Sequence, residues 1–128
     1  MKGVKYLSTQ NVTHRDLKPA NILLRAKQCK ISDFGFAKNI ESESAVMKSI
    51  VGTPLYMSPQ LLHKQKYTNK SDLWSIGLIF YEMLHGKTPW IANNELQLIN
   101  AIHTQKVNVS RNLSEETRDF IHRCLQVE

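Results

Sequence analysis

The sequence predicts a mainly α-helical fold that carries one short β-hairpin. Three stretches, residues 69–84, residues 95–103 and the residues that follow Ser114, repeat apolar side chains at helical spacing and have recognisable start or stop signals. Two short apolar pieces, residues 22–24 and 30–32, are joined by residues 25–29 and predict the hairpin. A length of 128 residues and a hydrophobic content of 41% suit one globular domain.

The longest helix is expected over residues 69–84. Its apolar run, LWSIGLIFYEML, is followed by His85-Gly86 and then by Pro89, which are typical of a helix end. The run has only twelve residues and contains Glu82, so it is too short to span a bilayer. We therefore expect a buried helix and no membrane segment.

Two further helices have clear N-terminal caps. Asn94 precedes the helix expected over residues 95–103, and Ser114 precedes a third helix with Glu115 and Glu116 in its first turn. Their predicted core faces are Leu98, Ile99 and Ile102 in the first, and Phe120, Ile121, Cys124 and Leu125 in the second.

The remaining chain is expected to be a helix end, a loop and a short helix. Residues 3–11 are typical of a helix that ends near residues 10–11. Residues 33–60 contain Gly, Ser, Thr and Pro without a clear period, so a long loop is expected, and loops of this length are usually functional. Residues 58–63 are expected to form one or two helical turns.

Charge and cysteine content limit the function classes. The formal charge is +6, but the basic residues are scattered and no aromatic side chains alternate with them, so we expect no nucleic-acid partner. Cys29 and Cys124 show no metal-binding spacing and are interpreted as reduced core residues. The first ten residues lack the apolar core of a signal peptide, and a cytoplasmic or nuclear protein is expected.

Two motifs suggest phosphoryl transfer, namely THRDLKPANILL near the N-terminus and DFGFAK soon after it. This chemistry needs an orienting base for the attacking hydroxyl, metal ligands and a cation near the transferred group. Asp16, Lys18 and Asn21 are expected to converge because their loop is short and contains Pro19, and Asp33 follows on the next loop. Asn and Asp oxygens suit Mg²⁺, and the Asp16 carboxylate can accept a hydroxyl proton.

Each motif alone has a structural interpretation. A single Asp-Phe-Gly is usually a turn, and a single His-Arg-Asp is usually surface. The order and spacing of both motifs, followed by GTPLYMSP and SDLWSIG, favour the functional interpretation.

With these motifs in this order, the sequence resembles the eukaryotic Ser/Thr protein kinase family over nearly its whole length. It is similar to the C-terminal lobe, from the end of helix E to helix H, so residues 1–128 are expected to be a partial kinase domain of the α+β kinase fold, without the N-terminal lobe. The resemblance implies ATP and Mg²⁺ as cofactors and a protein substrate with a Ser or Thr acceptor. DLKPAN together with GTP implies Ser/Thr specificity.

The same resemblance implies roles for individual catalytic residues. Asp16 would be the catalytic base, and Lys18 would support the transferred phosphate. Asn21 and Asp33 would hold the metal ions.

Other positions match the nucleotide pocket and the internal supports of the kinase fold. The strand that contains Leu23 matches the floor of the adenine pocket, and Ser32 matches the residue before the metal-binding aspartate. His14 and Phe34 match the regulatory spine. Asp72 matches the helix F aspartate that anchors the backbone of the catalytic loop.

The resemblance also implies control by an activating kinase. Ser49, three residues before Gly52, matches the usual primary phosphosite, and Arg15 and Lys38 match the cations that receive its phosphate. Thr53 matches the threonine beside the base and the lysine. A solvated loop serine is the alternative for Ser49.

The chain also departs from the family pattern. The Gly-rich loop, the β3 lysine and the helix C glutamate have no counterpart, and Gln60 replaces the glutamate of APE. This substitution and its surroundings resemble the autophagy-initiating (ULK-type) kinases. Two alternatives stay open: a partial sequence of an active enzyme, and a catalytically inactive truncated lobe that acts as a scaffold or competitor.

Overall fold

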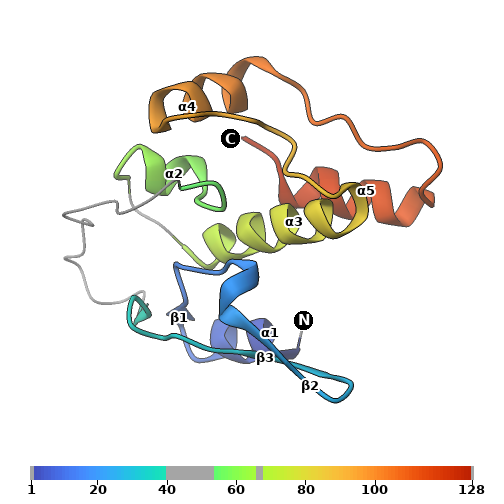
Figure 1. Ribbon diagram of the computed structural model, residues 1–128. Helices are drawn as coiled ribbons and strands as arrows, with labels where there is room; N and C mark the ends of the chain where they lie inside the picture. The colour runs from blue at the N-terminus through green and yellow to red at the C-terminus, as the bar shows by residue number, and fades with distance from the viewer. Residues whose placement is uncertain (1, 40–53, 66–67, 128) are drawn as a thin grey trace.

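The computed structural model describes residues 2–39, 54–65 and 68–127, and Figure 1 shows their arrangement. The elements in chain order are α1 (Lys2–Thr9), β1 (Val12–Thr13), the 3₁₀ helix η1 (Pro19–Asn21), β2 (Ile22–Arg25), β3 (Gln28–Ile31), β4 (Lys38–Asn39), α2 (Pro59–Leu62), α3 (Asn69–His85), α4 (Glu95–Thr104) and α5 (Glu115–Cys124). The prediction of a mainly helical fold with a short hairpin is confirmed.

Helix α3 runs through the middle of the molecule, with α2 and α4 on one side and α1 with the strands on the other (Figure 1). The Thr68 hydroxyl caps its N-terminus by accepting the N–H of Lys70. Gly86 ends the helix in the left-handed conformation, at a φ of 73°, which glycine adopts without a Cβ penalty. The predicted bounds of this helix are therefore confirmed to within one residue.

The main core lies between α3 and the helices α2, α4 and α5. Trp74 of α3 stacks on Trp90, with ring centroids 5.6 Å apart and planes within 6° of parallel. The other buried members of this core are Leu62, Leu78, Tyr81, Leu98, Ala101, Ile102, Val109, Ile121 and Leu125. Helix α5 approaches α3 closely at Gly77, because a side chain there would collide with Cys124.

The predicted caps of α4 and α5 are confirmed. Asn94 Oδ1 accepts the N–H of Gln97 at 2.9 Å, and Ser114 Oγ accepts the N–H of Thr117 at 3.3 Å. On the predicted core face of α5, Ile121 and Leu125 are buried, and Phe120 and Cys124 are half-buried. In the described part of the chain, no helix combines the length and the apolar character needed to cross a bilayer.

The hairpin forms with longer strands and a tighter turn than the sequence predicts. Arg25 pairs with Gln28, so only Ala26 and Lys27 form the turn. Ala26 takes a φ of 52°, a conformation that two-residue turns usually assign to Gly or Asn. Because neither residue stands at this turn, so short a connection could not be predicted from the sequence. The placement of Cys29 in the core is wrong, since this residue is exposed on β3.

A second antiparallel ladder joins β1 to β4 and is absent from the sequence-based prediction. Thr13 pairs with Lys38, and Val12 pairs with Asn39. The loop expected over residues 33–60 is therefore interrupted by β4, and its residues 40–53 lie outside the described part of the chain. The short helix expected near residues 58–63 is present as α2, capped by Ser58.

Candidate active site

The loop that follows β1 is fixed by a buried carboxylate from α3. Asp72 Oδ2 accepts the backbone N–H of His14 at 2.8 Å, and Oδ1 accepts that of Arg15 at 2.9 Å. Burial raises the pKa of the Asp72 carboxyl, and the two N–H donors oppose this effect. Arg15 has a φ of 73°, which is strained for a residue with a side chain and is held only by surrounding contacts. Helix α3 thus determines the path of the chain just before Asp16.

Asp16, Lys18 and Asn21 lie together, as the loop between β1 and β2 brings them to one place. Lys18 Nζ is 2.9 Å from Asp16 Oδ2. The Asn21 amide nitrogen donates to the backbone oxygen of Asp16 at 2.8 Å and to its Oδ2 at 3.0 Å. Because this nitrogen faces Asp16, the atom that Asn21 can offer to a cation is its amide oxygen.

Asp33 reaches the same region through a backbone connection. Ser32, just before it, donates its N–H to the Asn21 carbonyl at 2.9 Å and its hydroxyl to the same oxygen at 3.2 Å. Asp33 takes a φ of 60° and has an exposed carboxylate, which accepts the N–H of Gly35 at 3.3 Å. The donor set of an exposed carboxylate and an amide oxygen fits Mg²⁺, which binds through one or two such groups plus substrate phosphates.

His14 connects the parts of this site. Its Nε2 donates to the carbonyl of Ser32 at 3.0 Å, and its Nδ1 accepts the N–H of Asp16 at 3.4 Å. Both contacts require the tautomer that carries its proton on Nε2. The imidazole is completely buried and meets the ring of Phe34 edge to face, with centroids 4.9 Å apart. The buried histidine therefore ties the segment before Asp33 to the loop of Asp16.

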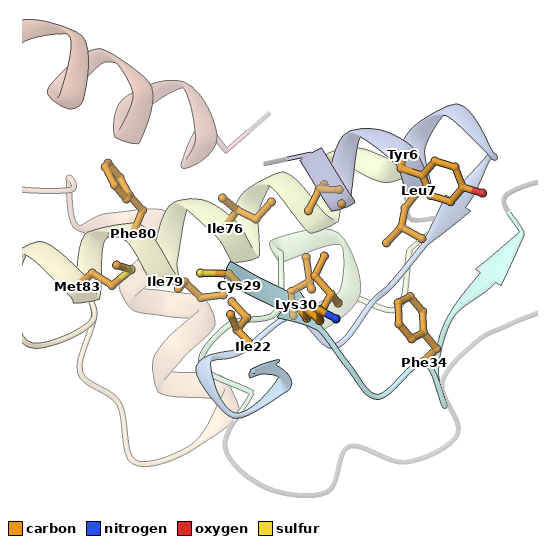
Figure 2. A pocket seen from close by; sticks show the side chains of 14 residues that line it. Tyr6, Leu7, Ile22, Cys29, Lys30, Phe34, Ile76, Ile79, Phe80 and Met83 are labelled. Carbon is orange, nitrogen blue, oxygen red and sulfur yellow. The ribbon is translucent and has the colours of Figure 1, made fainter. Parts of the chain in front are cut away.

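Leu23 lies on the opposite face of the hairpin from an apolar cavity. The cavity has a volume of about 680 Å³ and is lined by side chains of α1, the hairpin and α3, including Ile22, Ile79 and Phe80 (Figure 2). Since side chains alternate along a strand, Leu23 and Ile22 face opposite ways. Leu23 is 55% exposed, which leaves an open apolar side chain near Asn21 on the face away from the cavity.

The predicted regulatory residues are only partly described. Arg15 is 6% exposed and lines a small cavity together with Asp16, Lys18 and Pro54. Lys38 has its backbone in β4, paired with Thr13. The other two predicted residues, Ser49 and Thr53, lie outside the described residues.

The structure adds a pair of residues that sequence reasoning missed. Tyr56, in the segment beside Asp16, donates its hydroxyl to Glu82 Oε2 of α3 at 2.6 Å. Its backbone oxygen accepts the Ser75 hydroxyl at 2.7 Å. Burial and the neighbouring Glu82 both raise the pKa of Tyr56. Because the tyrosine and the glutamate are 26 residues apart, no local sequence pattern predicts their contact.

Comparisons with known proteins agree with the motifs. A family model of the protein kinase domain matches residues 1–128. The chain is 39% identical to serine/threonine-protein kinase atg1 of Dictyostelium discoideum, over 98% of this chain and 19% of that protein. It is 41% identical to serine/threonine-protein kinase fused of Drosophila melanogaster, over 98% of this chain and 16% of that protein.

A third relative, serine/threonine-protein kinase ATG1a of Arabidopsis thaliana, is 40% identical over 94% of this chain and 19% of that protein. The chain thus spans about a fifth or less of the length of these three curated relatives. The resemblance inferred from the motifs is confirmed, and ATG1-type kinases are among the relatives. The chain belongs to the protein kinase family.

Proposed function

We propose that these residues form the C-terminal, substrate-binding lobe of a Ser/Thr protein kinase that transfers a phosphoryl group from Mg-ATP to a protein hydroxyl. The observation that carries the proposal is the arrangement of Asp16, with Lys18 and Asn21 both in contact with its carboxylate. A carboxylate, a cation and an amide on one rigid loop are the parts that phosphoryl transfer needs from this side of the site.

Asp16 acts on the attacking hydroxyl. Its carboxylate is partly exposed, so it can orient a Ser or Thr hydroxyl and accept the proton as the hydroxyl attacks. Lys18, whose ammonium group already lies 2.9 Å from this carboxylate, supplies positive charge where negative charge develops on the transferred group. The Lys18 side chain is 41% exposed, which leaves room for a phosphate oxygen beside it.

Asn21 and Asp33 would hold the magnesium of Mg-ATP, which supplies charge neutralisation for the phosphates when bound. The two residues are joined through Ser32, which bonds the Asn21 carbonyl twice. The exposed apolar side chain of Leu23 suits the floor of an adenine pocket. The family resemblance supports the same assignments.

Preorganisation comes from residues that do not touch the substrate. Asp72 holds two backbone N–H groups before Asp16, and His14 holds the backbone on both sides of the site. A site fixed in this way pays little reorganisation at the moment of reaction. We therefore assign Asp72 and His14 as positioning residues.

Phosphorylation of Ser49 is the proposed control. A phosphate adds about −1.5 to −2 charges and three acceptor oxygens, and Arg15, directly before Asp16, is the proposed receiver together with Lys38. Two other serines, Ser42 and Ser44, lie next to Glu41 and Glu43 in the sequence, where more negative charge is unfavourable.

The proposal is tested with a chimera in which these 128 residues replace the matching segment of Dictyostelium atg1, to which they are 39% identical. The chimera should transfer label from ATP to a general protein substrate, only with Mg²⁺ present, and the product should contain phosphoserine and phosphothreonine. A folded chimera that binds ATP and yields no product, or yields phosphotyrosine alone, would contradict the proposal.

A further inference from the structure

A small cavity lies between the loop of Asp16 and the segment of residues 54–57. Its volume is about 70 Å³, and its lining includes Asp16 and Lys18 from the loop and Pro54 and Tyr56 from the segment. Residues 54–57 therefore form a wall beside Asp16, the acceptor wall. A substrate hydroxyl held at Asp16 is close to this wall.

The acceptor wall does not fix its own position. Its internal hydrogen bond runs from the Met57 N–H to the Pro54 carbonyl at 3.0 Å and closes a single turn. A bond within the turn sets the shape of the turn but not its place in the molecule. Tyr56 and Met57 also pack against the main core, but apolar contacts are not directional. The wall therefore depends on polar contacts with the rest of the chain for its exact placement.

Ser75 of α3 supplies such a contact. Its hydroxyl is 2.7 Å from the carbonyl oxygen of Tyr56, and the residue is only 4% exposed. A helical serine can instead donate to the carbonyl four residues earlier, and here the Ser71 carbonyl lies at 3.2 Å. Because a hydroxyl has one hydrogen to donate, the shorter distance assigns that hydrogen to the wall.

Helix α3 holds both sides of the cavity. Asp72 accepts the two backbone N–H groups just before Asp16, and Ser75, about one turn later, binds the acceptor wall. Both side chains are buried on the same packed helix. Groups mounted on such a helix keep their spacing better than groups on loops, so α3 sets the distance between the loop of Asp16 and the wall.

We propose that Ser75 is a positioning residue whose hydroxyl fixes the acceptor wall against α3 and thereby controls how tightly the protein substrate binds. This role builds on the proposed function, because it concerns the acceptor side of the same site. The proposed metal-binding side is held by other bonds, from Ser32 to the carbonyl of Asn21 and from His14 to the carbonyl of Ser32. Loss of the Ser75 hydroxyl should therefore affect the protein substrate and not ATP.

The first test is the kinetics of Ser75→Ala in the atg1 chimera. The KM for the general protein substrate should rise at least about threefold, because the wall loses a buried hydrogen bond. The KM for ATP should change less than about twofold. A purely structural role of Ser75 would lower the fraction of folded enzyme, and hence the apparent kcat, without changing either KM.

Ser71→Ala is the matched control. Ser71 lies on the same helix and is 3% exposed, and its hydroxyl makes no hydrogen bond with the residues that the structure describes. This variant should keep both KM values of the parent chimera. An equal rise in the KM for the protein substrate in Ser71→Ala would overturn the assignment to the Ser75 hydroxyl.

A second measurement does not depend on activity. In the 128-residue chain, hydrogen exchange of the Met57 amide should be at least about threefold faster in Ser75→Ala, since the wall opens more often. The amide of Leu98, which bonds to the Asn94 carbonyl on α4, should exchange as in the parent.

The proposal is overturned if Ser75→Ala keeps the parent KM for the protein substrate, raises the KM for ATP equally, or leaves the exchange of Met57 unchanged. A parent chimera without activity would contradict the proposed function instead. The exchange of Met57 would then still decide whether Ser75 fixes the wall.

Discussion

The Asp72 carboxylate of α3 accepts the backbone N–H of His14, 58 residues earlier in the chain, at 2.8 Å. Its other oxygen accepts the next N–H along the loop. The carboxylate is almost fully buried, and so is His14. One side chain of the central helix therefore sets the backbone from which Asp16 projects.

Asp72→Asn should destabilise the chain by about 1–3 kcal/mol, because an amide has one acceptor oxygen for two buried N–H donors. Urea denaturation measures the change, with Asp119→Asn, an exposed partner of Arg123 on α5, as the control that stays near the parent value. Equal midpoints for Asp72→Asn and the parent would show that the two hydrogen bonds contribute nothing.

Gly77→Ala should also destabilise the chain. A Cβ at this position would lie 2.5 Å from the Cβ of Cys124 and 3.0 Å from Cδ2 of Leu125. Overpacking of this kind costs about 1–3 kcal/mol. Because rotation of a side chain cannot move a Cβ atom, this cost should exceed the gain of about 1 kcal/mol that alanine gives a helix relative to glycine. Met83→Ala, at an exposed position of the same helix, is the control. A urea denaturation midpoint of Gly77→Ala at or above that of the parent would mean that α3 and α5 can move apart without loss of stability.

Tyr56→Phe should alter the alkaline stability of the chain. Burial and Glu82 raise the pKa of Tyr56 above its ordinary value of 10.0. The contribution of the protonated phenol is thus fully present below about pH 10 and is lost as the pH rises through the raised folded value. The stability difference between parent and Tyr56→Phe should be constant up to about pH 9.5 and then shrink. Exposed Tyr6→Phe should show no such trend, and a parent-to-Tyr56→Phe difference that stays flat at high pH would refute the assignment.

Ser49→Ala should lower the activity of the atg1 chimera roughly tenfold or more after treatment with an activating kinase, because the charge-assisted bonds of the phosphate to Arg15 are lost. Ser42→Ala is the matched control and should keep the parent activity. If the Ser49→Ala chimera kept full activity after treatment with the activating kinase, Ser49 would not be the regulatory phosphorylation site.

Local signals in the sequence predicted the helices well. Asn94, Ser114 and Gly86 act through bonds or backbone angles within a few residues of themselves, so their effect can be read without the fold. The contacts of Asp16 with Lys18 and Asn21 are similarly short in range. The motif that contains them therefore predicted their convergence.

Features set by distant contacts could not be predicted from local pattern. The β1–β4 ladder has only two residues in each strand, too few to show a period of two. Cys29 was expected in the core because it shows no metal-binding spacing, yet the two-stranded hairpin leaves it exposed. The hydrogen bond between the His63 and His103 side chains depends on the packing of α2 against α4. Neither local sequence contains a pattern that predicts it.

The most direct test of the account is the turnover of the atg1 chimera with Asp16→Ala. Removal of the base should lower kcat by roughly 10²–10⁴ while the KM for ATP stays close to the parent value, because Asn21 and Asp33 remain. Asp119→Ala should leave kcat unchanged, since that carboxylate lies exposed on α5. A folded Asp16→Ala chimera with the kcat of the parent would contradict the central claim that this loop carries the catalytic base.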